Sequence, residues 1–259
     1  MTDRHSNLNG VRMLIIGASS GIGRALAVAA RSRGAKVALA ARRVDVLSEL
    51  AGQIDGSAHE LDVSDPRAIE RVVDAVATAF GELDAIVFTS AVVPFALIED
   101  TDVTTWMHAY AVNAVGASHV LRSALPRLAD NAVVLIASSH DVGHPRAGVA
   151  AYHASKAALD EITRSWRAEH PELPVIRVSV GPTDGTEILR GADRDLLAEL
   201  YRAWAQEGQI PARMSAVDDV ANAMLSFIAV ARANPSVVSE IVHLAPRMAG
   251  PKHVKGNVE

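Results

Sequence analysis

Short runs of apolar and β-branched residues recur along the whole chain, with stretches of helical periodicity between them. Several runs are continuously apolar, residues 13–16 and 133–136 among them, which is typical of strands buried on both faces of a parallel sheet. Buried strands that alternate with helices predict a doubly wound α/β sheet of about seven strands, with helices on both faces. We expect strands at residues 11–17, 36–41, 58–63, 84–90, 132–138, 175–180 and 240–245.

Two of the stretches between the strands carry helix-start signals. Asp65 followed by Pro66 predicts a helix N-terminus, because aspartate caps free N–H groups and proline suits the first helical position, and Gly81 predicts the end of that helix. Ser215 and Asp218 have the spacing of a weak capping box ahead of another apolar-periodic stretch. We therefore expect a helix to begin at each place.

Length and composition are those of one globular domain. The chain has 259 residues, 49% hydrophobic and 21% charged, so a single domain over residues 1–259 is expected. A formal charge of −5 and a pI near 6.1 give no broad attraction to nucleic acid or anionic membrane. The sequence has no cysteine, no signal-peptide pattern and no apolar run long enough to span a bilayer. We expect a soluble, cytoplasmic protein without nucleic-acid or membrane partners.

One long segment, residues 184–213, interrupts the alternation after the sixth expected strand. It contains an amphipathic helix candidate, and ligands of open α/β sheets bind beyond the carboxyl ends of the strands, so the segment is a candidate lid over a substrate. The alternative is a surface helix packed on the core. The apolar side of the helix candidate carries Leu196, Leu197, Leu200, Tyr201 and Trp204.

The tail at 246–259 lacks periodicity and is expected to be flexible.

A glycine-rich turn follows the first expected strand and precedes a helix candidate at 24–33. Residues 17–23 read Gly-Ala-Ser-Ser-Gly-Ile-Gly. Glycines allow a tight turn and close approach of a pyrophosphate, and a helix N-terminus supplies free N–H groups with a partial positive charge. Such a turn between a buried strand and a helix indicates a dinucleotide site, with a plain strand-to-helix turn as the alternative.

Two arginines stand where a site for NAD usually has an acidic residue. Arg42 and Arg43 directly follow the second expected strand, nineteen and twenty residues after Gly23. A carboxylate there would repel the 2′-phosphate of NADP, whereas arginine binds it by charge-assisted and often bidentate contacts. The pattern therefore predicts NADP(H) as the cofactor, unless both arginines are merely solvated charges at a strand end.

Tyr152 and Lys156 lie four residues apart in a helix candidate that runs to about residue 167, and so share one face. A tyrosine with its ordinary pKa near 10 is a poor base at neutral pH, and a neighbouring ammonium is expected to lower that pKa. Ser139 ends the fifth expected strand, where its hydroxyl can hold a substrate oxygen beside the tyrosine. By itself a tyrosine and a lysine at this spacing are common on helices.

The glycine turn, the interval from Ser139 to Tyr152 and the Tyr-x-x-x-Lys pair together resemble the short-chain dehydrogenases/reductases, over about residues 11–245. The resemblance implies a single-domain Rossmann fold in which Tyr152 is the general acid/base and Ser139 orients the carbonyl oxygen. It also implies that Lys156 binds the nicotinamide ribose and that Asn113 holds a water of the proton relay. The remaining cofactor contacts that it implies are Gly17, Ser19, Ser20, Gly21, Ile22, Gly23, Asp62, Val63, Ser90, Ala91, Gly181, Pro182, Thr183 and Thr186.

The family pattern is interrupted after the fourth expected strand. Where the family usually has Asn-Asn-Ala-Gly, residues 89–92 read Thr-Ser-Ala-Val, and the Val92 side chain could crowd the cofactor. We expect an NADP(H)-dependent oxidoreductase that transfers a hydride to or from a carbonyl or alcohol carbon. The alternative is a non-catalytic NADP(H)-binding regulatory or interaction protein. The resemblance further implies a homodimer or a homotetramer.

Candidate substrate contacts are His140, Tyr201 and Trp204. His140 directly follows Ser139, and the two aromatic residues lie in the lid candidate. His140 and His144 have a spacing that could hold a metal, but they lack a third ligand, and no metal site is expected.

Overall fold

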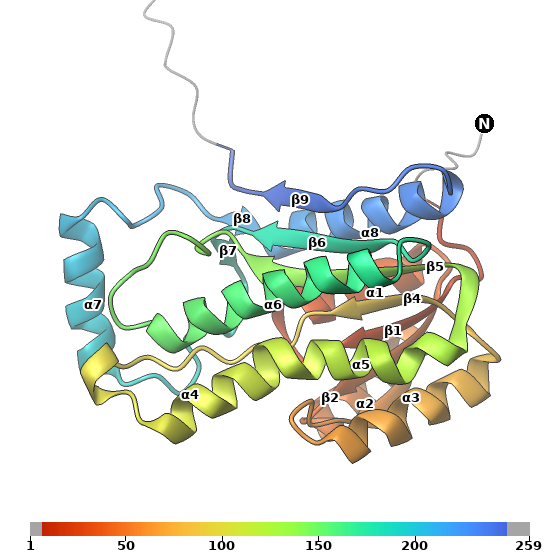
Figure 1. The fold of residues 1–259 in the computed structure, drawn as a ribbon, viewed down its shortest axis with the longest axis horizontal. Coiled ribbons are helices and arrows are strands. Elements are labelled where there is room, and N and C mark those ends of the chain that lie inside the picture. Colours follow the sequence, from red (N-terminus) through yellow and green to blue (C-terminus); the bar gives the residue numbers. More distant parts are fainter. Residues whose placement is uncertain (1–6, 248–259) are drawn as a thin grey trace, which may run out of the picture.

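The computed structural model describes residues 7–247 as one domain built on a seven-stranded parallel sheet. Strand order is β3-β2-β1-β4-β5-β6-β9, and Figure 1 shows helices covering both faces. The predicted doubly wound fold is confirmed, and each expected strand is present with its ends shifted by a few residues at most. The strands are Arg12–Ile16 (β1), Lys36–Ala41 (β2), Ser57–Glu60 (β3), Leu83–Phe88 (β4), Leu128–Ser139 (β5), Val175–Val180 (β6) and Ile241–Leu244 (β9).

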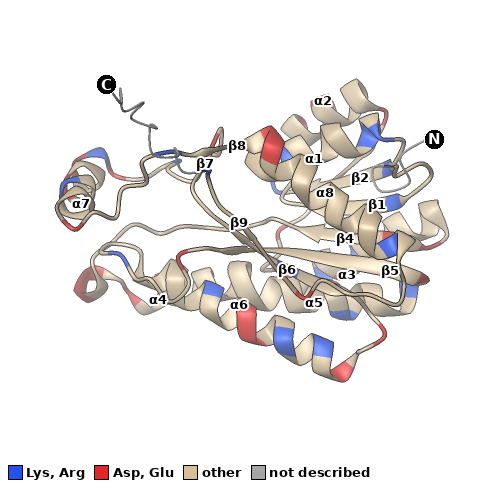
Figure 2. Cartoon of the chain, turned by 90° about the horizontal axis from the view of Figure 1, so that it is seen from above, with Lys and Arg blue, Asp and Glu red and all other residues tan. Residues whose placement is uncertain are grey.

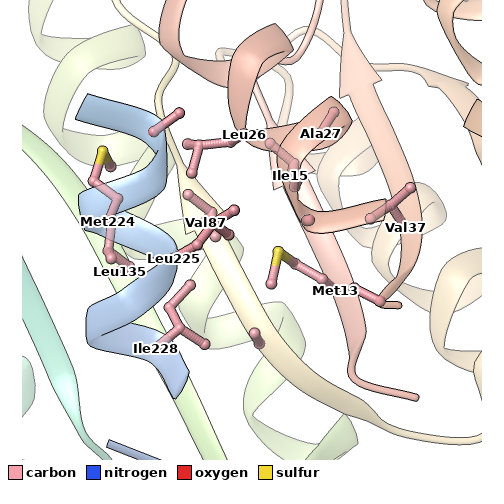
Figure 3. Close-up of a cluster of buried hydrophobic side chains, with 14 of the residues drawn as sticks. Met13, Ile15, Leu26, Ala27, Val37, Val87, Leu135, Met224, Leu225 and Ile228 are labelled. Carbon is pink, nitrogen blue, oxygen red and sulfur yellow. The ribbon is translucent and has the colours of Figure 1, made fainter. Parts of the chain in front are cut away.

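Successive residues of a strand point alternately into two hydrophobic cores, one on each face of the sheet. Met13 and Ile15 of β1 pack into one core, whereas Leu14 and Ile16 pack into the other, as the alternation of side chains along a strand requires. Figure 3 shows part of the first core, where α1 and α8 cover the sheet. This double burial explains why the strands read as continuous apolar runs. The first core is covered by α1 (Gly21–Ser32), α2 (Val44–Ile54) and α8 (Val217–Ala233), and the second by α3 (Pro66–Phe80), α5 (Gly116–Ala124) and α6 (Ala150–Glu169).

A helix begins at both predicted places, but only one of the two predicted caps is formed. The Asp65 side chain accepts the Arg67 N–H at 2.9 Å, Pro66 opens α3, and Gly81 ends it. The capping box fails, because α8 begins after Ala216 without a side-chain cap. Ser215 instead belongs to β8 (Ser215–Ala216), which pairs with β7 (Thr183–Asp184). Strand pairing has overridden the local capping pattern.

Residues 184–213 lie beyond the carboxyl ends of the strands. Their amphipathic stretch forms α7 (Arg194–Gln206), capped by Asp193, and Figure 1 shows α7 standing apart at the end of the sheet to which β6 points. Leu200 and Trp204 are buried and Tyr201 is exposed. Most of the tail at 246–259 falls outside the described residues.

Charges of both signs are interspersed along the helices of both layers, as Figure 2 shows. Within residues 7–247, no helix is long and apolar enough to cross a bilayer.

Candidate active site

The strand order reverses between β1 and β4. The strands that follow β1 in the chain, β2 and β3, lie on one side of it, and those that follow β4 lie on the other side. Ligands of such sheets bind outside the carboxyl ends of the strands at this reversal. The glycine turn follows β1 there, residues 89–92 follow β4, and Ser139 ends the neighbouring β5. The fold therefore gathers three of the predicted motifs at one edge.

The glycine turn is tightly packed against the loop after β4. A Cβ on Gly17 would lie 2.6 Å from the Ser90 nitrogen, and one on Gly23 would lie 2.3 Å from the Gly17 carbonyl oxygen. Only glycine fits at these two positions. Helix α1 begins at Gly21, earlier than expected, and its first-turn N–H groups have no partners within the helix. This backbone surface fits the pyrophosphate of a dinucleotide.

In the Thr-Ser-Ala-Val loop, the Val92 side chain is packed into the protein and does not crowd the glycine turn. Its side chain packs against the second core, and its backbone is held by Asn113. The Val92 N–H donates to Asn113 Oδ1 at 2.8 Å, and Asn113 Nδ2 donates to the Val92 carbonyl at 2.9 Å. Thr89, which sequence reasoning passed over, donates its hydroxyl to the Ile16 carbonyl and fastens the loop to β1.

Asn113 also connects this loop to the helix of the tyrosine and lysine. It is fully buried in a π-helical segment, Ala111–Val115, a feature frequent at functional sites. Its Nδ2 donates to Ser155 Oγ at 2.9 Å, and Ser155 donates in turn to the Tyr152 carbonyl at 2.7 Å. Both amide hydrogens of Asn113 are therefore used within the protein.

Tyr152 lies next to Ser139, as predicted, but its pKa moves in the direction opposite to the expected one. The tyrosine is 9% exposed, and burial raises its pKa to about 12 against the opposing effect of a hydrogen bond with the Ser139 side chain. Lys156 is 3% exposed and its ammonium donates to the Ala137 carbonyl at 2.9 Å; it does not counter this, because its own pKa is low enough for it to lose its charge before the phenol ionises. Burial lowers the pKa of Lys156 to about 8. The expected lowering of the tyrosine pKa is thus wrong for this structure, since desolvation dominates.

A buried carboxylate lies one turn beyond Lys156 on the same helix. Asp160 accepts the Ser138 hydroxyl at 2.5 Å and pairs with Arg177 of β6. Its charge acts on both Lys156 and Tyr152, raising each pKa. Sequence reasoning missed this residue, although its spacing of four from Lys156 places it on the face that carries Tyr152.

Arg43 lies over the glycine turn and Arg42 is exposed beside it. The Arg43 guanidinium donates to Ser19 Oγ at 3.0 Å and pairs with Glu187 at 2.9 Å. Asp62 uses its carboxylate to accept the N–H and hydroxyl of Ser64, while Val63 is buried in the second core.

The loop after β6 closes over the glycine turn. The Thr183 hydroxyl donates to the Gly181 carbonyl at 2.9 Å, and the Pro182 carbonyl accepts the Ser215 N–H. Thr186 lies against Gly21, with its Cα 3.5 Å from where a Cβ on that glycine would be. The predicted nicotinamide loop and the predicted phosphate turn are therefore in contact.

The three candidate substrate residues lie in different surroundings. His140 is exposed and stacks on His144, with 6.0 Å between ring centroids. Tyr201 lines a cavity of about 420 Å³ between α7 and residues 183–190. Trp204 is buried, and its indole donates to the Ala147 carbonyl at 3.0 Å beneath the Arg146 guanidinium. Trp204 therefore packs α7 onto the loop after β5.

Over the described part of the chain, no cluster of three acidic or histidine residues suits a metal ion.

Comparison with known proteins gives concordant matches. A family model described as short chain dehydrogenase matches residues 12–196. An uncharacterized oxidoreductase of Staphylococcus epidermidis is 32% identical over 185 residues, covering 67% of this chain and 80% of the relative. A short-chain dehydrogenase from Burkholderia cenocepacia solved in complex with NADP superposes with a TM-score of 0.78 at 26% identity, covering 92% of this chain and 98% of the other.

Some relatives are much longer than this chain. Glycine betaine reductase ATRR of Emericella nidulans is 30% identical over 84% of this chain, which spans 17% of its length. The chain spans about half the length of the 11-beta-hydroxysteroid dehydrogenases of Sesamum indicum and Arabidopsis thaliana that it matches.

Proposed function

This chain belongs to the short-chain dehydrogenase/reductase family of oxidoreductases, and on that premise we propose that it transfers a hydride between NADP(H) and a carbonyl or alcohol carbon. Tyr152 is the proton donor and acceptor in this proposal. The observation that carries it is the pairing of Tyr152 with Ser139 at the end of β5, on the sheet edge that also carries the glycine turn. A protein that only binds a dinucleotide needs no such pair.

Residues of the sheet edge would hold the cofactor. The glycine turn would take the pyrophosphate and Arg42 and Arg43 the 2′-phosphate, while Lys156 and the loop of Thr183 and Thr186 would hold the nicotinamide half. When bound, the cofactor supplies or accepts the hydride.

The chain's own residues handle the oxygen and its proton. Ser139 hydrogen-bonds the substrate oxygen and so fixes the carbonyl beside the phenol. With a pKa of about 12 the Tyr152 phenol is protonated at neutral pH, so it carries the proton that the carbonyl oxygen receives. The side-chain amide of Asn113 is committed to Val92 and Ser155, so we assign its contact with a relay water to its backbone carbonyl in the π-helical segment.

A Tyr152→Phe variant tests the chemistry. It removes one hydroxyl and keeps the ring, so NADPH affinity is retained while turnover of a carbonyl substrate falls by several orders of magnitude. Turnover equal to that of the wild type would refute the role of Tyr152. Tight NADPH binding by the wild type, without its oxidation by any member of a broad carbonyl panel, would favour the non-catalytic binder.

Cofactor preference is tested separately by an Arg43→Ala variant. Hydrogen bonds to charged groups contribute about 1.5–3 kcal/mol, so NADPH affinity falls roughly tenfold to a hundredfold while NADH affinity changes little. Arg67→Ala, an exposed arginine of α3, is the matched control and leaves both affinities unchanged. Tenfold tighter binding of NADH than of NADPH by the wild type would overturn the preference.

We also propose a homodimer or homotetramer. Exposed apolar side chains on and after α4 (Val103–Tyr110) support it, since Val103, Met107 and Val115 are each more than half exposed. Light scattering on the eluting protein should give two or four times the 27.3 kDa chain mass, and a monomer at all concentrations would contradict it.

A further inference from the structure

A carboxylate of the loop after β6 is held by the arginine that would bind the 2′-phosphate. Glu187 Oε2 lies 2.9 Å from Arg43 Nη2, although the two residues are far apart in the sequence. Arg190 also approaches this carboxylate, at 3.3 Å, and the Ser20 hydroxyl hydrogen-bonds to it. Contact with Arg43 above all lowers the pKa of Glu187, so it is an anion throughout the neutral range.

The groups around this carboxylate are those of an anion site. Arg43 donates to Ser19 Oγ at 3.0 Å, so its guanidinium is already oriented over the glycine turn. Ser20 is the N-cap of α1, next to helix N–H groups that favour negative charge. The chain thus places one of its own anions at the start of α1, among the donors that a ribose phosphate would require.

We propose that Glu187 competes with the 2′-phosphate of NADP(H) for Arg43, so that binding of this cofactor releases the loop that Glu187 anchors. The inference rests on the proposed preference for NADP(H). Two anions repel when they share one guanidinium, whereas NAD(H) has no phosphate at that position and leaves the pair intact. Glu187 is therefore a specificity-determining residue that lowers affinity for NADP(H) selectively.

Release of Glu187 would also affect the cavity next to α7, where substrate contacts are predicted. The anchored loop continues into residues 188–190, which line the 420 Å³ cavity together with Tyr201 and Met214. Breaking the contact with Arg43 frees one wall of this cavity. Binding of the phosphate and the shape of the cavity are thereby coupled through a single side chain.

A Glu187→Gln variant isolates the competition. The side chains of Glu187 and Arg43 are 45% and 29% exposed, and exposed ion pairs contribute modestly, so the affinities for 2′-AMP and NADPH should rise about twofold to fivefold. Affinities for AMP and NADH stay unchanged. The gain shrinks in high salt, because the contact is screened. Glu199→Gln, an equal change of charge on an exposed position of α7, is the matched control and alters none of these affinities.

Calorimetric titration of the full chain with the four nucleotides gives the affinities, and hydrogen exchange of residues 184–193 gives the second measurement. Saturating 2′-AMP should speed exchange of this loop in the wild type, and Glu187→Gln should show the faster exchange without any nucleotide. In an Arg43→Ala background, Glu187→Gln should add nothing to the affinity.

Two results would overturn the inference in distinguishable ways. If the wild type prefers 2′-AMP over AMP and Glu187→Gln binds 2′-AMP no better, the competition is refuted and the NADP(H) preference stands. If the wild type does not prefer 2′-AMP and NADPH over AMP and NADH, the preference itself fails and the inference fails with it.

Discussion

Replacing Lys156 with methionine is expected to stabilise the fold while removing turnover. The side chain is 3% exposed, and burial lowers its pKa from 10.5 to about 8 against the opposing effect of Asp160. Folding therefore costs free energy at any pH where the lysine of the unfolded chain is charged. One pKa unit corresponds to about 1.4 kcal/mol, so this cost is about 3 kcal/mol at pH 7.

The sign of the pH dependence follows from the lowered pKa. Below pH 8 the folded protein carries the full cost of the buried ammonium, and the cost disappears as the pH rises from 8 towards 10.5. At pH 9.5 about 1 kcal/mol of it remains. Methionine removes the charge at similar length, but it leaves the Ala137 carbonyl without this donor, which costs about 1 kcal/mol. The net gain is about 2 kcal/mol at pH 7 and about zero at pH 9.5.

Urea unfolding followed by tryptophan fluorescence at pH 7, 8 and 9.5 measures this difference. Tyr152 is present in both proteins, so its own titration cancels to a first approximation. Lys36→Met, at the exposed start of β2, is the control and should stay within about 0.5 kcal/mol of the wild type at each pH. A Lys156→Met protein less stable than the wild type at pH 7, by an amount that does not vary up to pH 9.5, would refute the reasoning.

Three further substitutions have outcomes set by the structure. Gly23→Ala should abolish cofactor binding and destabilise the turn, because its Cβ would meet a backbone carbonyl at 2.3 Å. Gly52→Ala, in the last turn of α2 where a Cβ meets nothing within 4 Å, should instead stabilise by about 0.5–1 kcal/mol; both are read by thermal unfolding and NADPH titration. Asp160→Asn should cost about 3–5 kcal/mol in urea unfolding, because it leaves the Arg177 guanidinium buried without its anion, and a cost under 1 kcal/mol would contradict that account. Trp204→Ala should cost about 3 kcal/mol and speed hydrogen exchange in α7 and residues 140–149, and unchanged exchange there would show that the indole does not hold them together.

Features set by local chemistry were predictable from the sequence. Buried parallel strands must be apolar on both faces, so the runs at 13–16 and 133–136 identified β1 and the centre of β5. Asp65 and Gly81 act on backbone groups a few residues away, and both predictions are confirmed. The capping box at Ser215 failed because a partner strand more than thirty residues earlier, containing Thr183, pairs with that residue.

Features that depend on tertiary burial were not predictable. A lysine four residues from a tyrosine indicates proximity, but whether it lowers the tyrosine pKa depends on how far both groups are removed from water. Here desolvation exceeds the effect of the neighbouring charge for Tyr152. The contact of Arg43 with Glu187 is equally invisible in the sequence, since it joins the segment after β2 to the segment after β7, more than 140 residues later.

The spacing of four residues on α6 arranges three polar groups along one helix face, leading away from the sheet edge that carries the proposed active site. Tyr152 contacts Ser139 at the sheet edge, Lys156 is one turn deeper and bonds a backbone carbonyl of β5, and Asp160 is anchored by Arg177 on β6. The charge of Asp160 acts to raise the pKa of both groups, which for Tyr152 adds to the effect of burial and for Lys156 only partly offsets it. With its pKa raised to about 12, Tyr152 rests as the phenol, the form that donates a proton to a carbonyl oxygen, whereas removal of a proton from an alcohol starts from the phenolate. If Tyr152 is the acid/base as proposed, we expect the rate of alcohol oxidation to rise with pH up to the tyrosine pKa, while carbonyl reduction proceeds at neutral pH.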